Sequence, residues 1–186
     1  MRTFIAIEIP ETVKVELAKL QAELRRTGAE VGWANPDTIH LTLRFLGETE
    51  ERQLDQVKQL CANTAAEFHP FTLRFKDTGY FPNYRQPRVL WVGLAGEMEV
   101  ATQLQKRLEE QVIEMGFDHE DKPFKPHLTI GRVKSSKNVK PLVAKADMYV
   151  LPELSLEVGE LVLFKSELHP AGARYTALAR SELRKN

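Results

Sequence analysis

The chain has little of what cross-links, membranes and extended nucleic acids require. Cys61 is the only cysteine among 186 residues, so no internal disulfide forms and no metal site is built on thiolates alone. No stretch approaches the ~20 apolar residues of a membrane span. The apolar run in the first ten residues is interrupted by Glu8 and is too short for a signal peptide. These absences predict a cytoplasmic protein that does not bind membranes.

An excess of charge of one sign is also missing. The 26 Lys and Arg residues balance 26 Asp and Glu residues, which gives a net charge of zero at pH 7. Proteins that wrap long nucleic acids usually carry a basic excess. The balance therefore indicates a small contact, such as an RNA end, or a small-molecule ligand, and it is compatible with a local basic cleft.

The hydrophobic patterns predict an α+β protein. Apolar residues at helical spacing alternate with short runs rich in β-branched and aromatic residues. The segment 81–87 is rich in turn formers, and 119–126 reads as an exposed loop. We expect strands over 2–9, 38–46, 71–79, 88–94, 127–133, 154–164 (bent at Gly159) and 174–179, and helices over 11–27, 50–68, 98–115 and, more weakly, 138–147.

The order of these elements indicates an internal duplication. Each half reads strand, helix, His-containing strand, helix, strand, and the two His strands lie 87 residues apart, at His40 and His127. We therefore expect a single bilobed domain over 1–186, with sequence halves 1–80 and 88–186 joined by 81–87.

The two His strands carry the same His-Leu-Thr triplet, at His40 to Thr42 and at His127 to Thr129. Side chains alternate along a strand, so the His and Thr of each triplet share one face and the apolar residues share the other. If the halves pack about a pseudo-two-fold axis, both polar faces meet in one cleft.

Two imidazoles and two hydroxyls suit the hydrolysis of a phosphodiester. One neutral His takes a proton from water, one charged His protonates the leaving oxygen, and the hydroxyls donate to the phosphate oxygens. The near-symmetry of the triplets leaves donor and acceptor unassigned. A zinc site is the alternative, but zinc takes three or four ligands and no His-x-x-x-His spacing is present, so we expect neither metal nor cofactor.

The remaining histidines are weaker candidates. His69 and His169 each precede a proline at a turn, which is typical of solvated residues. His119, in the loop before the second His strand, is either a substrate contact or an ordinary solvated residue.

Three segments resemble the two-histidine phosphoesterases, and more narrowly the RNA 2′,3′-cyclic phosphodiesterase branch, also known as 2′-5′ RNA ligases. They are Arg2–Ile7, Trp33–Glu48 and Pro123–Val133. The resemblance implies two pseudo-symmetric β-α-β-α-β lobes with mainly antiparallel sheets around a central cleft. It also implies metal-free hydrolysis of a 2′,3′-cyclic phosphate to a 2′-phosphomonoester.

The resemblance further implies roles for individual residues. His40 is then the proton donor to the departing 3′ oxygen and His127 the acceptor that activates water, while Thr42 and Thr129 hold the phosphate oxygens. The implied partner is an RNA with a 2′,3′-cyclic phosphate end, such as a tRNA fragment, or a related nucleotide. We expect the protein to act as a monomer.

Two arginines could add to the phosphate site. Arg132 matches an arginine that the family often has five residues after the second His, and a guanidinium suits a phosphate well. Strict alternation points Arg132 away from His127, so either the strand ends or bulges near Gly131 or Arg132 has a structural role. Arg44 lies four residues after His40, so alternation places it on the same face of the strand. It is a weaker candidate than Arg132.

Three other functions remain open at this point. The same residues could run the reaction in reverse and ligate RNA ends through a 2′-5′ bond. The chain could bind nucleotides or RNA ends without catalysis, or it could hydrolyse another small cyclic nucleotide ester.

Overall fold

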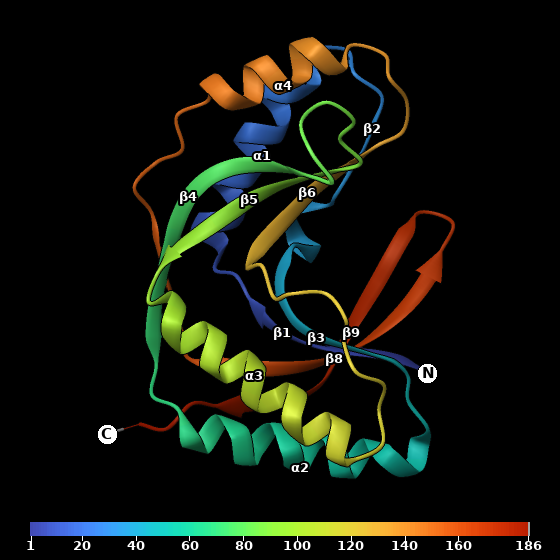
Figure 1. Ribbon diagram of the computed structural model, residues 1–186, viewed down its shortest axis with the longest axis vertical. Helices are drawn as coiled ribbons and strands as arrows, with labels where there is room; N and C mark the ends of the chain where they lie inside the picture. Colours follow the sequence, from blue (N-terminus) through green and yellow to red (C-terminus); the bar gives the residue numbers. More distant parts are fainter. Residues whose placement is uncertain (186) are drawn as a thin grey trace.

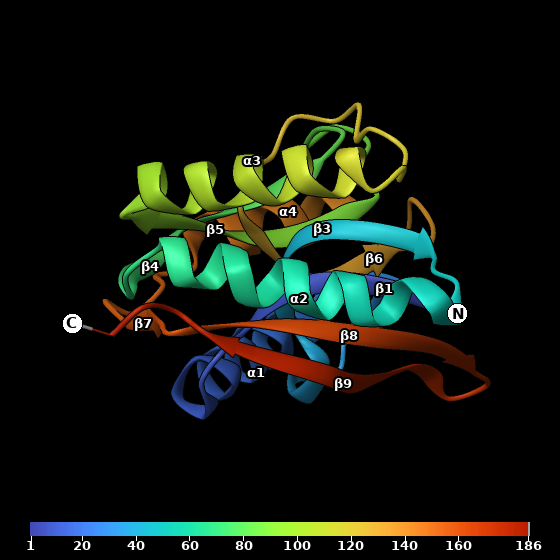
Figure 2. The same cartoon turned by 90° about the horizontal axis from the view of Figure 1, so that it is seen from below.

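The computed structural model describes residues 1–185 as helices packed on two antiparallel sheets (Figures 1 and 2). The helices are α1 (Glu11–Arg25), α2 (Glu51–Glu67), α3 (Met98–Glu114), α4 (Val139–Met148) and a short 3₁₀ turn, η1 (Pro36–Thr38). The strands are β1 (Arg2–Glu8), β2 (Val31–Trp33), β3 (His40–Glu48), β4 (Phe71–Phe81), β5 (Val89–Gly96), β6 (His127–Val133), β7 (Ser155–Val158), β8 (Glu160–His169) and β9 (Gly172–Glu182).

One sheet has the order β3-β1-β8-β9 and the other β2-β6-β5-β4-β7. All of their strand pairs are antiparallel, which confirms the α+β class and the antiparallel sheets. The two His strands, β3 and β6, occupy equivalent places beside β1 and β5, so the pseudo-symmetry of the halves is visible in the strand order.

The composition of the two sheets differs from the simplest expectation of one lobe for each half. The third strand of the first half, β4, pairs with β5 of the second half, and β8 of the second half pairs with β1 of the first. The matching triplets of strands are therefore β3-β1-β8 and β6-β5-β4. Neither half of the sequence can complete its sheet without the other.

The helices are exchanged in the same way. α1 follows β1, but Gln21 on α1 donates to the carbonyl oxygens of Ile130 (2.9 Å) and Ala34 (2.7 Å), beside β6. α3 follows β5 but contacts β3, and α2 contacts both β8 and β9. In Figure 1, α1 and α4 lie near β4, β5 and β6, and α2 and α3 lie at the opposite end of the molecule.

One continuous core joins the two sheets. It contains buried residues from β1, β3, β4, β5, β6 and β8 together with residues from all four helices. A second, small apolar cluster lies on the other face of the four-stranded sheet, where Phe4, Ala6, Val162 and Phe164 pack with Tyr175. His40 stacks on this second cluster, which places it on the face of the sheet away from the helices.

Several element boundaries differ from those expected. β2 has three residues, too few for an alternating pattern to be visible, and it exists because it pairs with the end of β6. β4 runs past Gly79 to Phe81, which pairs with Val89. Gly159 separates β7 from β8 instead of bending one strand, because the two segments pair in different sheets.

Within residues 1–185, no helix is both long and apolar enough to cross a membrane.

Gly79 gives a test of the packing beneath the second His strand. Gly79 pairs with Trp91, and a Cβ atom at Gly79 would lie 2.1 Å from Cη2 of the indole. Gly79→Ala must push back a ring that also lies against His127, so we expect it to destabilise the fold by about 1–3 kcal/mol, the usual cost of overpacking. Urea unfolding measures the change.

Gly159→Ala is the matched control, because a Cβ atom there meets no atom within 4 Å. Equal stability of the two variants would show that the Trp91 ring is not held against Gly79.

Candidate functional site: a two-histidine cavity between the sheets

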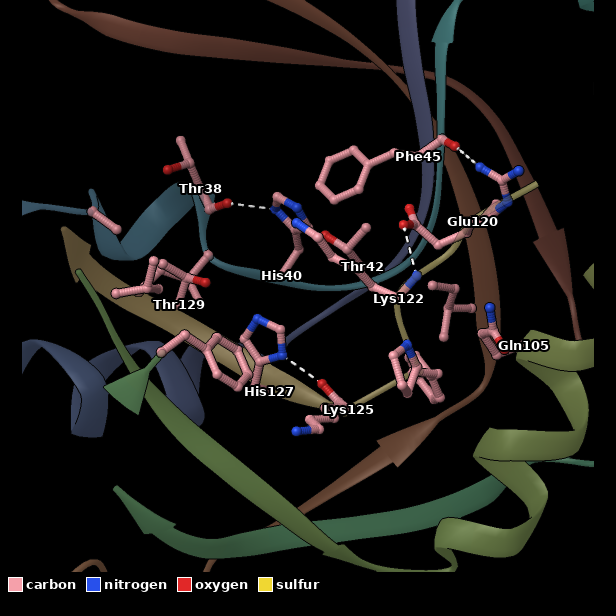
Figure 3. Close-up of a pocket in the computed structure, with 18 of the residues that line it drawn as sticks. Thr38, His40, Thr42, Phe45, Gln105, Glu120, Lys122, Lys125, His127 and Thr129 are labelled. Carbon is pink, nitrogen blue, oxygen red and sulfur yellow. Dashed lines mark hydrogen bonds between the residues drawn. The ribbon is translucent and has the colours of Figure 1, made fainter. Parts of the chain in front are cut away.

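A cavity of about 700 Å³ opens between the two sheets and is lined by residues of both His strands. The structure brings together in it all five residues expected at the site. In Figure 3 the two imidazoles face one another across the cavity, with Thr42 and Thr129 beside them. The five residues are His40 and Thr42 on β3, and His127, Thr129 and Arg132 on β6.

Each His strand contains a β-bulge at the same place, three residues after its histidine. In β3, Thr42 pairs with Ala6 and Arg44 with Ile5, so Leu43 has no partner on β1. In β6, Thr129 pairs with Trp91 and Gly131 with Leu90, so Ile130 is the extra residue. An extra residue resets the alternation of side chains along the strand.

The bulge in β6 determines on which face of the strand Arg132 lies. After the extra residue, Arg132 lies on the same face as His127 and Thr129 and lines the cavity, while Gly131 is buried. A bulge near Gly131 was one of the two expectations from the sequence. The guanidinium is close enough to lower the pKa of His127.

The bulge in β3 corrects the expectation for Arg44. Arg44 is among the residues that line the cavity, but the extra residue turns its guanidinium toward α3 instead of onto the His40 face, and its side chain is only 5% exposed. Phe45 lies instead on the face of β3 that lines the cavity, and it is 57% exposed. Phe45 and Arg132 are therefore the equivalent residues of the two strands.

The two histidines are held by the same kind of hydrogen bond. Nδ1 of His40 lies 2.8 Å from the carbonyl oxygen of Thr38, and Nδ1 of His127 contacts the carbonyl oxygen of Lys125. A carbonyl only accepts, so Nδ1 carries a hydrogen in both rings. Nε2 makes no hydrogen bond within residues 1–185 and is the nitrogen left for chemistry.

Aromatic rings fix the planes of the two imidazoles. The His40 ring stacks on Phe4, with centroids 4.7 Å apart, and meets Tyr175 edge-on at 5.2 Å. The His127 ring meets Phe81 edge-on at 5.0 Å. With the ring planes and Nδ1 both fixed, neither imidazole can turn without losing contacts.

Burial is the largest influence on both imidazoles and lowers both pKa values below the ordinary 6.5. The hydrogen bonds to the carbonyl oxygens act to raise both pKa values, and only the nearby charges differ between the two rings. Glu8, opposite His40 on β1, works to raise the pKa of His40, whereas the Arg132 guanidinium lowers the pKa of His127 further. Charge next to His40 thus favours the imidazolium, and charge next to His127 favours the neutral ring.

A buried ion pair anchors the loop that forms one wall of the cavity. Arg44 donates through Nε to Glu109 on α3 and through its two other guanidinium nitrogens to the carbonyl oxygens of Phe45 and Asp118. The other carboxylate oxygen of Glu109 accepts from the Glu120 N–H (2.9 Å) and contacts Nδ1 of His119 (2.6 Å).

This anchor also shifts the pKa of Glu109. Burial on its own raises the pKa of this carboxyl, but hydrogen bonds from the Glu120 N–H, His119 and Arg44 outweigh burial and leave the pKa below its ordinary value. The carboxylate is therefore ionised and keeps its ion pair with Arg44 at neutral pH.

The other histidines lie outside the cavity lining. His119 contacts Glu109, is not a lining residue and has a side chain that is 66% exposed, which agrees with the expectation of a solvated residue rather than a substrate contact. His69 contacts the carbonyl oxygen of Arg184 (3.0 Å), and His169 ends β8. Within residues 1–185, no group of three or more His, Cys, Asp and Glu side chains is placed to hold a metal ion.

Several lining residues were not expected from the sequence: Phe45, Phe81, Lys122, Lys125 and Tyr175 among them. Lys122 and Lys125 stand five and two residues before His127, so their basic character close to the second triplet was a usable signal. Phe45 and Tyr175 had no signal, because one depends on a bulge and the other on strand pairing at the end of the chain.

Two sheets related by pseudo-symmetry, each presenting one His-Leu-Thr strand to a shared cavity, define a two-histidine phosphoesterase. The model of the LigT-like phosphoesterase family matches the chain twice, over residues 7–91 and 92–175. The chain therefore belongs to the LigT-like phosphoesterases. The double match also agrees with the duplication, since the two matches begin within β1 and β5, the equivalent first strands of the two halves.

The similar proteins cover nearly the whole chain. The RNA 2′,3′-cyclic phosphodiesterase of Methanothermobacter thermautotrophicus is 33% identical over 95% of both chains, and that of Thermus thermophilus is 38% identical over 99% of this chain and 91% of its own. The crystal structure of TT0787 from Thermus thermophilus superposes with a TM-score of 0.82 at 34% identity, covering 99% of this chain and 98% of its own. Escherichia coli LigT complexed with 3′-AMP superposes with a TM-score of 0.78 at 27% identity, with the same coverage.

The anchor gives a prediction for Glu109→Gln. The substitution removes the only carboxylate paired with Arg44 in the described part of the chain and leaves a buried guanidinium charge. We expect a loss of about 3 kcal/mol in the free energy of unfolding, typical of a broken buried pair. We also expect faster amide exchange in 118–122, because Glu109 holds the Glu120 N–H. Denaturant unfolding and hydrogen exchange measure the two effects.

Glu110→Gln, one residue along α3 and 50% exposed, is the control and should change stability by less than about 0.5 kcal/mol. A loss no greater than that of the control would mean that the Arg44–Glu109 pair does not hold the loop.

Proposed function

We propose that the chain hydrolyses the 2′,3′-cyclic phosphate ends of RNA to 2′-phosphomonoesters, with the two histidines as acid and base and without a metal ion. The observation that carries the proposal is the pair of imidazoles in one cavity, each with Nδ1 held by a carbonyl oxygen and Nε2 free. It is supported by similar proteins that carry the name RNA 2′,3′-cyclic phosphodiesterase and match nearly the whole chain.

The reaction is a displacement at phosphorus. Nε2 of His127 takes a proton from a water molecule, whose oxygen bonds to phosphorus. The bond between phosphorus and the 3′ oxygen breaks, and Nε2 of His40 gives its proton to that oxygen. The product carries a 2′-phosphate and a free 3′ hydroxyl, and the two histidines end with exchanged protonation states. Each such proton transfer is typically worth ~10²–10⁴-fold in rate.

The charges around the two histidines favour this order of donor and acceptor. A donor must start as imidazolium, and Glu8 favours that form of His40. An acceptor must start neutral, and Arg132 favours that form of His127. A bound phosphodiester anion stabilises the imidazolium of His40 further.

The remaining polar groups suit the charge that develops on the phosphate. Thr42 and Thr129 share faces with the two histidines, so their hydroxyls can donate to the two non-bridging oxygens. Arg132 adds a fixed positive charge at the same cavity. The RNA partner, the monomeric state and the cytoplasmic location remain predictions.

The first test is the reaction itself. We expect the chelator-treated protein to convert an RNA 2′,3′-cyclic phosphate to a 2′-phosphate, and His40→Ala and His127→Ala each to lower kcat by at least ~10²-fold while the fold is kept. His169→Ala, outside the cavity lining, is the control. Phosphorus NMR identifies the product.

A 3′-phosphate product would contradict the donor and acceptor order, and loss of activity on chelation would contradict the metal-free mechanism. Ligation is measured in parallel at equal RNA concentration. We expect hydrolysis to exceed it, because the hydroxyl of a dilute RNA competes with ~55 M water for the same phosphate.

The second test is the pH profile. Burial lowers the pKa of both free-enzyme imidazoles, so we expect the falling limb of kcat/KM below pH 6.5. The falling limb of kcat should lie at higher pH, because the bound anion raises the pKa of His40. Arg132→Gln should move the rising limb to higher pH, because it removes the cation that lowers the pKa of His127. An unmoved rising limb in this variant would contradict the placement of Arg132 beside the base.

A further inference from the structure

Positive charge is concentrated in two parts of this net-neutral chain. Residues 122–146 include seven Lys and Arg residues and residues 78–96 include two, and neither range contains an Asp or a Glu. The other residues therefore carry 17 Lys and Arg against 26 Asp and Glu. A chain whose total charge is zero can still present a strongly basic face to a polyanion.

The two basic ranges meet at one end of the five-stranded sheet. The Val133 N–H, at the end of β6, donates to the carbonyl oxygen of Arg88 (2.9 Å), just before β5. In Figure 1 the β4–β5 loop and the β6–α4 loop both lie at the end of the molecule occupied by α4. Five exposed cations of these loops and the start of α4, none of them in the cavity lining, make up a basic surface: Arg85, Arg88, Lys134, Lys137 and Lys140.

Lys134 joins the basic surface to the cavity. It lies two residues after Arg132, so the two side chains share one side of the sheet with His127. Gly32 pairs with Arg132, and a Cβ atom at Gly32 would lie 3.0 Å from Cε of Lys134. The lysine side chain therefore lies across β2 on the same face as Arg132. A row of cations thus begins inside the cavity at Arg132 and leaves it at Lys134.

The charges of the basic surface are not neutralised by neighbouring side chains. None of the five cations forms an ion pair within residues 1–185, whereas Lys145, farther along α4, pairs with Glu23 (3.5 Å). Glu30 accepts from the Lys134 N–H through its backbone carbonyl oxygen (2.8 Å), but its carboxylate pairs with none of the five. Clustered like charges repel one another, and a bound polyanion relieves that repulsion.

The equivalent end of β3 has the opposite character. β3 and β6 diverge from the level of the two histidines (Figure 1). Seven residues after its histidine, β3 has Gly47 where the second half has Lys134. The residues that follow Gly47 include three glutamates: Glu48, Glu50 and Glu51. The N-terminal ammonium and Arg52 pair with the first two. A polyanion with its end in the cavity therefore meets unpaired cations where β6 ends and carboxylates where β3 ends.

The β4–β5 loop adds an aromatic ring to the basic surface. Tyr84 is 59% exposed, and the guanidinium carbon of Arg85 lies 5.7 Å from its ring centroid. Exposed rings among unpaired cations are typical of surfaces that bind single-stranded nucleic acids, where the cations contact phosphates and the rings stack on bases. This combination favours a single strand of nucleic acid over an acidic protein as the polyanion.

We propose that the basic surface binds the phosphates of single-stranded RNA on the 5′ side of the terminal nucleotide, so that the strand leaves the cavity along β6 toward α4. The proposal rests on the proposed function, because that function places the 3′ end of the RNA in the cavity. Phosphate contacts carry no sequence information, so the surface increases affinity for any RNA strand with this end. The zero net charge indicated a small contact, and a few phosphates beside one terminus are such a contact.

The test compares two ligands that differ only in length: an RNA octamer with a 2′-phosphate end and the nucleoside 2′-monophosphate of its last residue. Calorimetry gives the Kd of each at about 50 and about 200 mM salt. Each phosphate contact of a single strand contributes about 0.7 to the slope of log Kd against log salt, so three contacts correspond to ~20-fold over this range. We expect added salt to weaken the octamer at least ~20-fold more than the monophosphate.

The triple variant Lys134→Gln, Lys137→Gln and Lys140→Gln removes three of these contacts. We expect the slope for the octamer to fall by about 2, because each lost contact removes about 0.7. The octamer Kd should approach that of the monophosphate. The monophosphate should bind this variant and the wild type alike, because the three lysines lie outside the cavity lining.

The matched control removes the same net charge from exposed positions outside the cavity lining that also form no ion pair within residues 1–185. It is the triple variant Arg74→Gln, Lys76→Gln and Lys106→Gln, and its slope for the octamer should equal that of the wild type. Circular dichroism checks that both triple variants stay folded. A control that loses as much octamer affinity as the lysine variant would show a general effect of net charge, which contradicts a defined surface.

An octamer that binds no more tightly than the monophosphate would overturn the basic surface, and so would an unchanged slope in the lysine variant. A wild-type protein that hydrolyses no cyclic phosphate contradicts the proposed function instead. Because both ligands are bound without turnover, the dependence of Kd on length and salt decides the basic surface separately.

Discussion

One extra residue in each His strand determines what reaches the cavity. With Leu43 and Ile130 bulged, the fifth residue after each histidine joins the His-Thr face and the fourth turns into the protein. Without the bulges, Phe45 and Arg132 would lie on the buried faces, where a guanidinium without a carboxylate costs several kcal/mol. The bulges occur at equivalent positions in both halves, so they belong to the duplicated unit rather than to one strand.

Features that depend on residues close together in the sequence were predicted correctly. The predictions failed where pairing between distant strands determines the structure. The triplets at His40 and His127 were found because alternation over three residues needs no knowledge of the partner strand. Arg44 was misplaced because a bulge is visible only in the register against β1. The exchange of β4 and β8 escaped for the same reason, since strand order along the chain does not say which sheet a strand joins. Glu120, which lines the cavity, was not predicted because it belongs to no sequence motif.

A duplicated fold supplies two equivalent histidines, but the chemistry needs two different ones. Two imidazoles in identical surroundings share one pKa, so at any pH they favour the same protonation state. The carbonyl contacts at Nδ1 are the same in both halves, so they fix orientation and act to raise both pKa values without distinguishing the two rings. The difference comes from residues that are not equivalent, Glu8 at one histidine and Arg132 at the other. Symmetry therefore positions the pair, and departures from symmetry favour the roles proposed for the two histidines.

The exchange of strands makes the cavity a property of the whole fold. Because β4 and β8 each complete the sheet of the other half, each sheet contains strands of both halves, and the two His strands cannot move apart without disturbing the continuous core that joins the sheets. The loop wall is held in addition by the buried Arg44–Glu109 pair. Acid–base catalysis rewards such fixed geometry, since a misplacement of about 1 Å can cost ~10²-fold in rate. The stability of the sheets and the placement of the two imidazoles therefore depend on the same contacts.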